Sequence, residues 1–158
     1  MNKYNSEQAL TRLAAYCSHA EHCIFDVRRQ MEKWKMTPEQ QTQIIQKLQA
    51  EGFLDEERYC KALVNDRSRY NNWGVYKIKY ELRKKHISDS MIQKALENID
   101  PEENLNRLRM VIEQKKKSVK GKNEFEIKHK LMRFAMSRGF MLKDVELVLG
   151  VSGEWEQD

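Results

Sequence analysis

A short apolar pattern recurs three times along this chain of 158 residues. The three copies, separated by 51 and 49 residues, are Val27-x3-Met31, Ile78-x3-Leu82 and Ile127-x3-Leu131. After each copy comes a short turn and then another segment with apolar residues at helical spacing. A period near 50 residues predicts tandem helical units. Units of this size must stack on one another, because each alone buries little apolar surface.

The predicted helix boundaries are marked by capping residues. Thr37-Pro38-Glu39-Gln40 combines an N-cap hydroxyl, a proline at the first helical position and a glutamine at the third. Asp100-Pro101-Glu102-Glu103 repeats this arrangement with an aspartate as the cap. With only six glycines and two prolines to interrupt them, nine helices are expected, at 5–18, 22–35, 38–51, 56–70, 75–86, 89–99, 102–120, 124–138 and 142–150.

These helices predict an all-α fold, an elongated tandem array of three three-helix repeats. We place the repeats at residues 1–54, 55–100 and 101–150, followed by an acidic tail at 151–158. Such an array presents a long curved surface, which suits a long partner.

The net charge of +5 hides two strongly basic blocks. Residues 61–86 contain eight Lys or Arg and two acids, and residues 107–138 contain eleven and three. The segments between and around these blocks have more acids than bases. This distribution favours a surface that binds a polyanion such as nucleic acid. The alternative is that the lysines only keep helix faces in water.

The expected helix at 75–86 separates apolar and cationic residues. On a helical wheel, Val75, Ile78 and Leu82 form one narrow apolar stripe. The broad opposite face carries two tyrosines and most of the cations. Cations attract phosphates, and tyrosine rings can stack on unpaired bases. The equally open alternative is that the tyrosines pack against a neighbouring repeat. The candidate contacts are Lys77, Lys79, Arg83 and Lys84, joined by Arg67 and Arg69 from the preceding helix.

A second candidate region is the run QKKKSVKGK at 114–122. Lysines near a helix C-terminus are favoured by the helix dipole, which is the simplest explanation for the run. A cluster this dense could also contact a phosphate backbone without reading base sequence. Lys115, Lys116 and Lys117 are therefore secondary candidates.

Other functional classes find little support. In CSHAEHC (17–23) four metal-ligand types crowd one helix end and turn, where tetrahedral convergence on zinc is difficult. No phosphate-binding loop, zinc-protease motif or nucleophile elbow is present in the sequence. No apolar run reaches the length of a membrane span, and the N-terminal residues lack a signal-peptide core. We expect a cytoplasmic protein that is not an enzyme and that has no cofactor, no metal and no membrane partner.

Two elements of the middle repeat resemble the RecX family of bacterial regulatory proteins. The first is EGFLDEERY (51–59) and the second is NNWGVYKIKYELRKKHI (71–87). Family members carry a G-Y/F-L/I-D-D/E-E-R-F/Y element, followed by a glycine, isoleucine, leucine, lysine and isoleucine at the spacing of the second. His86 stands where the family usually has glycine. The resemblance is strong over about a third of the chain, looser over the first repeat and weakest over the third.

This resemblance implies three tandem three-helix repeats and a function in DNA repair, recombination and the SOS response. It implies binding to the RecA recombinase, chiefly as a filament on single-stranded DNA. Family members typically restrain strand exchange, ATP turnover and coprotease activity, and some stimulate them. We expect a monomer that reaches single-stranded DNA through the filament. Two other functions stay open: a nucleic-acid-binding helical repeat without a recombinase partner, and a helical protein–protein adaptor.

Overall fold

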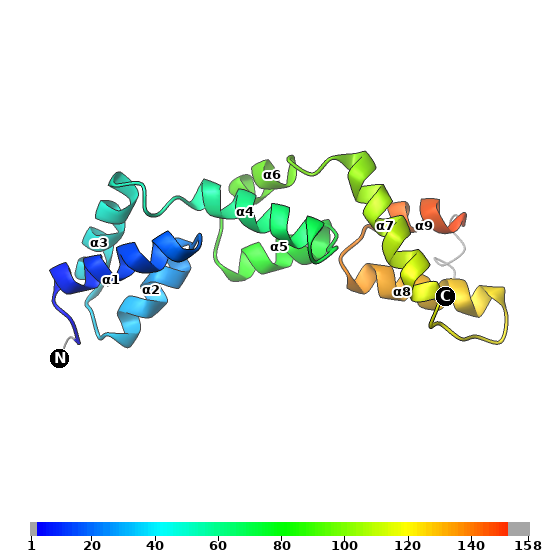
Figure 1. Cartoon of the computed structure of the whole chain (residues 1–158), viewed down its shortest axis with the longest axis horizontal. Helices are drawn as coiled ribbons and strands as arrows, with labels where there is room; N and C mark the ends of the chain where they lie inside the picture. Colours follow the sequence, from blue (N-terminus) through cyan, green and yellow to red (C-terminus); the bar gives the residue numbers. More distant parts are fainter. Residues whose placement is uncertain (1–2, 152–158) are drawn as a thin grey trace.

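The computed structural model describes residues 3–151, and these form nine α-helices in three consecutive groups (Figure 1). The groups follow one another along the longest axis of an elongated molecule. The predicted all-α array of three three-helix repeats is confirmed. The helices are α1 (Ser6–His19), α2 (Ile24–Lys33), α3 (Pro38–Ala50), α4 (Glu56–Arg69), α5 (Val75–Lys84), α6 (Asp89–Leu96), α7 (Pro101–Lys116), α8 (Glu124–Ser137) and α9 (Leu142–Leu149).

Capping side chains explain where most of these helices begin. Thr37 caps α3 as predicted, and the Gln40 side chain accepts a hydrogen bond from the Thr37 backbone N–H in return. The Asp100 side chain accepts from the Glu103 N–H at the start of α7. Caps of the same kind begin four further helices, at Asn5, Asp55, Ser88 and Asn123.

Each group of three helices has its own core of buried apolar side chains. The first is built from α1–α3, the second mainly from α4–α6 and the third from α7–α9. Buried Cys23 and half-buried Phe25, at the start of α2, pack into the second core. The boundaries at 54/55 and 100/101 stay predictions. The predicted acidic tail lies, except for Val151, outside the described residues.

The same turn follows the second helix of each repeat. Lys35, His86 and Gly139 all have left-handed backbones, with φ of 61°, 59° and 96°. The next residue in each case is buried: Met36, Ile87 or Phe140. Its backbone N–H donates to the carbonyl five residues earlier, on Met31, Leu82 or Ala135. This Schellman arrangement ends the helix and buries an apolar residue after it. Glycine adopts the left-handed conformation most easily, which accounts for its use in the family motif at position 86.

This turn corrects the alignment of the third repeat. The structural counterparts of Val27-x3-Met31 and Ile78-x3-Leu82 are Leu131 and Ala135. The predicted Ile127-x3-Leu131 pattern lies one helical turn too early, and Ile127 is only half-buried at the edge of the third core. The period is therefore 51 and then 53 residues.

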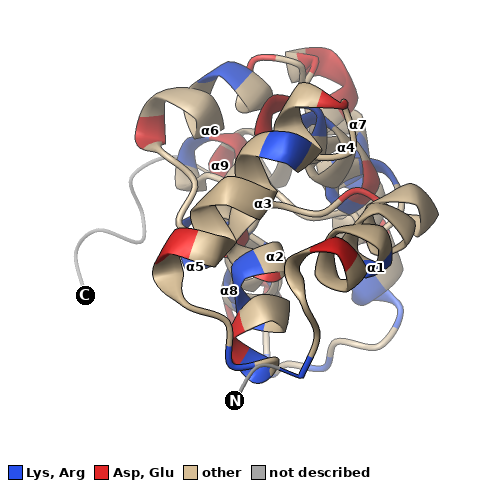
Figure 2. Cartoon of the chain, turned by 90° about the vertical axis from the view of Figure 1, so that its left-hand side faces the viewer, with Lys and Arg blue, Asp and Glu red and all other residues tan. Residues whose placement is uncertain are grey.

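Equivalent helices of the three repeats lie on one side of the array. In Figure 1, α2, α5 and α8 follow one another along the lower edge, and in the end-on view of Figure 2 they project near one another. Figure 2 also shows that acidic and basic residues are interspersed around the molecule. The sequence blocks of positive charge therefore do not form one uniformly basic face.

Side chains join the first repeat to the second. The contacts are Lys85 to Asp26 (2.6 Å), Arg58 to Glu21 (2.6 Å) and the Ile24 backbone N–H to Glu56 (2.9 Å). Burial raises the pKa of Asp26, but the hydrogen bond and charge of Lys85 outweigh burial, so this pKa lies below its ordinary value. The first junction therefore depends on charge.

Backbone atoms join the second repeat to the third. The Gly74 N–H donates to the Arg138 carbonyl (2.7 Å), and the Tyr76 N–H donates to the Gly139 carbonyl (2.9 Å). A Cβ atom at Gly74 would lie 2.4 Å from the Gly139 carbonyl carbon. The second junction therefore depends on the absence of a side chain at Gly74.

Candidate nucleic-acid interface

A groove of about 540 Å³ lies beside α5, where this helix meets the first turns of α2. It therefore spans the junction between the first and second repeats. The groove is lined by Phe25, Arg29, Trp73, Lys77, Tyr80, Glu81, Lys84 and Lys85. Three aromatic rings and four cations in one groove are the residue types that bind single-stranded nucleic acid.

All four cations lie against aromatic rings of the same groove. The Lys85 Nζ is 5.4 Å from the centre of the Phe25 ring. The Lys77 Nζ is 4.5 Å from the centre of the Trp73 ring, and the Lys84 Nζ is 5.4 Å from that of Tyr80. The Arg29 guanidinium carbon is 5.7 Å from the centre of the Phe25 ring. These distances are within the range of cation–π attraction, which holds the charges beside the rings.

The groove has an excess of positive charge. Glu81 receives two hydrogen bonds from Arg67, both 3.1 Å long, and Lys85 is paired with Asp26. Arg29, Lys77 and Lys84 form no ion pair with any residue in the described range 3–151. Three cations are thus available to neutralise phosphate groups.

The four candidates on α5 have different environments. Lys77 and Lys84 line the groove, whereas Lys79 and Arg83 do not. Lys79 is half-buried, and Arg83 lies on the surface 3.5 Å from Asp89. The role of all four residues in binding stays a prediction, and the geometry favours Lys77 and Lys84 over the other two.

The candidates on α4 are also unequal. Arg67 is held by Glu81, and its guanidinium lies 5.3 Å from the centre of the Trp73 ring, so it contacts two residues of the groove without lining it. The hydrogen bond to Glu81 raises the Arg67 pKa. Arg69 is exposed at the end of α4. Arg69 also acts on Arg107, a residue of α7. Burial lowers the pKa of Arg107, and the nearby positive charge of Arg69 lowers it further.

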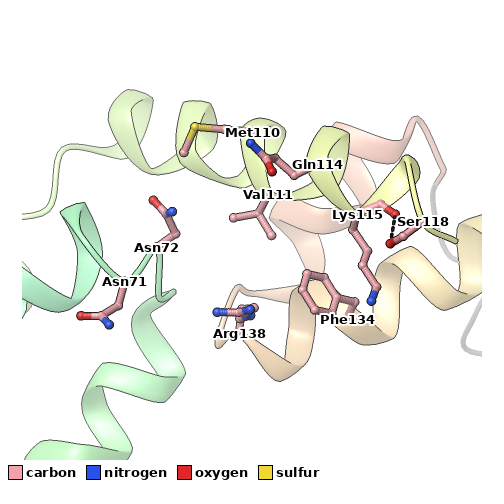
Figure 3. Close-up of a pocket in the computed structure, with 9 residues that line it drawn as sticks. All are labelled: Asn71, Asn72, Met110, Val111, Gln114, Lys115, Ser118, Phe134 and Arg138. Carbon is pink, nitrogen blue, oxygen red and sulfur yellow. Dashed lines mark hydrogen bonds between the residues drawn. The ribbon is translucent and has the colours of Figure 1, made fainter.

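Three lysines at the end of α7 have three different surroundings. Lys115 points into a separate cleft, where its Nζ lies 4.6 Å from the centre of the Phe134 ring (Figure 3). Lys116 is 3.3 Å from Glu113, and Lys117 is an exposed C-cap residue. Their proposed contact with phosphates stays a prediction.

Sequence reasoning missed two residues of the groove, Phe25 and Arg29. Both lie on α2, in the first repeat, while the candidate face is on α5. The feature of the sequence that could have indicated them is the pair Arg28-Arg29 shortly after Phe25. That the start of α2 lies near α5 depends on how two repeats stack, which local periodicity does not reveal.

The residues of CSHAEHC are used in packing and hydrogen bonding. Cys17 is buried in the first core and Cys23 in the second, where burial raises the pKa of each thiol. His22 stacks on Tyr16 at 3.7 Å between ring centres and lies 3.4 Å from Asp26. Across residues 3–151, no group of three or more His, Cys, Asp or Glu side chains is placed to hold a metal ion. In the same range, every helix is too short or too polar to cross a bilayer.

Comparison with known proteins connects this architecture to one family. Residues 55–96 match the family model described as RecX, second three-helix domain, and residues 102–149 match RecX, third three-helix domain. A regulatory protein RecX from Actinobacillus pleuropneumoniae serotype 5b (strain L20) is 30% identical over 132 residues, which are 84% of each chain. Another from Clostridium tetani (strain Massachusetts / E88) is 35% identical over 99 residues, 61% of this chain and 45% of that relative.

A solved structure has the same fold. The crystal structure of RecX from Lactobacillus salivarius superimposes with a TM-score of 0.84 and covers 92% of this chain and 94% of its own, at 16% sequence identity. At that identity the likeness supports the fold alone, whereas the family models and the Actinobacillus relative are matches in sequence. Together, the two matched three-helix domains and this relative show that the chain belongs to the RecX family of regulatory proteins.

Proposed function

We propose that this protein binds filaments of the RecA recombinase on single-stranded DNA and restrains their recombinase, ATPase and coprotease activities. Membership of the RecX family supports a regulatory role. The observation that carries the DNA part of the proposal is the groove beside α5, with three aromatic rings and three cations that form no ion pair among residues 3–151. No chemical step is required of the protein.

The proposed mechanism is steric and electrostatic. The elongated array lies along the filament and contacts recombinase subunits and DNA phosphates together. Lys77, Lys84 and Arg29 neutralise phosphates, while Trp73 and Tyr80 offer ring surface to exposed bases. An array held in this way disfavours the addition of further subunits and the movements that accompany ATP turnover.

The groove also favours a second function, the binding of single-stranded nucleic acid without a recombinase. Cations beside aromatic rings bind a single strand with little sequence preference. The two functions differ in one measurable respect: only the first requires the recombinase for tight binding.

A charge-matched pair of variants tests both functions. The groove variant combines Arg29→Gln, Lys77→Gln and Lys84→Gln. The control combines Lys33→Gln, Lys47→Gln and Lys143→Gln, which removes three exposed cations that do not line the groove. Binding to labelled single-stranded DNA, with and without cognate RecA, is followed by fluorescence anisotropy over a range of salt concentrations.

We expect only the groove variant to lose affinity for the filament. Its slope of log K against log salt should be shallower by about 2, because three phosphate contacts on a single strand are lost. Equal affinity of the groove variant and the wild type, with intact helicity, would exclude the groove from binding. Tight binding to DNA that RecA does not improve would favour the second function.

A further inference from the structure

A second cleft, of about 360 Å³, lies at the junction between the second and third repeats (Figure 3). Its walls come from the loop between α4 and α5, from one face of α7 and from the end of α8. No Asp or Glu is among the residues that line it. The cleft is thus separate from the groove beside α5 and is electrically positive.

Two cations of this cleft lie against one aromatic ring. The Lys115 Nζ is 4.6 Å, and the Arg138 guanidinium carbon 5.1 Å, from the centre of the Phe134 ring. Neither cation forms an ion pair within the part of the chain that the structure describes. In Figure 3 the two cations lie on opposite sides of the Phe134 ring, so the cleft offers positive charge to an anion from two sides.

The other residues that line the cleft offer amide groups and an apolar wall to a nucleobase. The Asn72 Oδ1 is buried and has no hydrogen-bond donor, and the Asn72 backbone is left-handed, with φ of 55°. A buried acceptor without a partner is unfavourable, and because this atom is shielded from solvent, the Asn72 side chain must turn toward the cleft before a ligand N–H can reach it. Gln114 adds a second amide, and Met110 and Val111 add an apolar wall (Figure 3). Amides of this kind can pair with the edge of a nucleobase.

We propose that this junction cleft binds a phosphate-bearing nucleotide, free or as one unit of a single strand. The phosphate lies in the field of Lys115 and Arg138, which flank the Phe134 ring, and the edge of the base meets Asn72 and Gln114. The volume falls within the range of small-ligand pockets. The site is independent of the groove beside α5, so it can be tested without the recombinase and stands or falls apart from the proposed function.

The first experiment compares three ligands by isothermal titration calorimetry of the full chain: dAMP, a short deoxyadenosine oligonucleotide and inorganic phosphate. We expect dAMP and the oligonucleotide to bind, and phosphate to bind at least about tenfold more weakly than dAMP, because it makes no base contacts. Binding of the oligonucleotide alone would assign the cleft to a nucleotide within a strand. Equal binding of phosphate and dAMP, or no binding of either nucleotide ligand in the millimolar range, would overturn the proposal.

Three variants locate the binding site. Lys115→Gln and Arg138→Gln should each weaken binding about tenfold, as expected for the loss of a hydrogen bond to a charged group. Asn72→Asp should also weaken it, because a carboxylate offers no N–H to the edge of the base and adds a negative charge to a cleft that binds an anion; aspartate tolerates the left-handed backbone. The matched control is Lys116→Gln, a neighbouring lysine that pairs with Glu113 outside the cleft.

The control and the groove variant should both bind dAMP as the wild type does. Circular dichroism establishes that each variant is folded, and Asn72→Asp serves as the test if the Arg138 variant is unstable. Wild-type affinity in the folded cleft variants would contradict the proposal. If only the groove variant lost affinity for the oligonucleotide, the cleft would be excluded while the proposed function stood.

Discussion

The two junctions between repeats are built in opposite ways. Between the first and second repeats, charged side chains span the contact, with Lys85 bound to Asp26 at 2.6 Å as its most buried pair. Between the second and third repeats, backbone atoms meet directly at Gly74 and Gly139. The same three-helix unit is therefore joined once by charge and once by close backbone approach. The first junction should respond to pH and salt, and the second to the size of a single residue.

This difference also separates the two proposed binding surfaces. The groove beside α5 contains Lys85, which belongs to the charged junction, and Phe25, which packs into the second core. The cleft at the second junction is lined by Arg138, whose carbonyl accepts the Gly74 N–H. Each surface is thus shaped by how two repeats meet, so a change at one junction should disturb one surface more than the other.

The largest effect is expected for Gly74→Ala. The new methyl group would overlap Gly139 and the Phe140 nitrogen, each 2.4 Å away, so the third repeat must move and the two backbone hydrogen bonds weaken. We expect the free energy of unfolding to fall by about 3 kcal/mol, the upper part of the range for overpacking. Urea denaturation measures the loss. The control is Gly52→Ala, where no atom lies within 4 Å and only the left-handed backbone (φ 79°) opposes the change. Equal losses in the two variants would show that the second junction does not depend on close backbone approach.

The next largest effect is expected for Lys85→Met. This change leaves the largely buried Asp26 carboxylate without its main partner, at a cost of about 2 kcal/mol in unfolding free energy. Adding Asp26→Asn to Lys85→Met should restore part of this loss, because the unpaired charge disappears. A double-mutant cycle measures the coupling. Additive effects of the two changes would mean that the pair does not stabilise the first junction.

A smaller effect is expected from acid. The pKa of Asp26 is lower in the folded protein than its ordinary value, so its stabilising contribution is present above about pH 4 and is lost as pH falls through the folded pKa. The difference in unfolding free energy between wild type and Asp26→Asn should therefore shrink as pH is lowered from about 5 to 2. Denaturation curves over this range measure it. A difference that stays constant would contradict the depressed pKa.

The smallest effect is expected for Glu21→Gln. The Arg58–Glu21 pair is partly exposed, and such pairs contribute less than about 1 kcal/mol at low salt. The loss should disappear at high salt, whereas the loss from Gly74→Ala should persist. Denaturation at two salt concentrations distinguishes them. A Glu21→Gln effect that is large and independent of salt would place more of the first junction's stability in this pair.

Local patterns predicted most of the fold and little of the contact between repeats. Thr37 and Asp100 marked helix starts because capping is a property of neighbouring residues. The pattern predicted for the third repeat was one helical turn too early. The reason is that Ile127, Leu131 and Ala135 are spaced four residues apart and lie on the same stripe of α8. The small side chain of Ala135 concealed its place at the centre of the third core.

The candidate site was predictable only in part, for a related reason. Lys77 and Lys84 were found because one helix carries both. The pairing of Arg67 with Glu81 joins two helices, and the contact of Gly74 with Gly139 joins two repeats. Arg29 reaches the groove from the first repeat. Such contacts depend on tertiary packing, which helical periodicity does not encode.

ATP turnover by cognate RecA on single-stranded DNA tests the central claim most directly. At saturating concentration, the wild-type protein and the variant with Lys33, Lys47 and Lys143 replaced by glutamine should both slow turnover. The groove variant, with Arg29, Lys77 and Lys84 replaced, should need a higher concentration for the same effect. Unchanged turnover at saturating wild-type protein would contradict the proposal that this member of the RecX family restrains the recombinase filament.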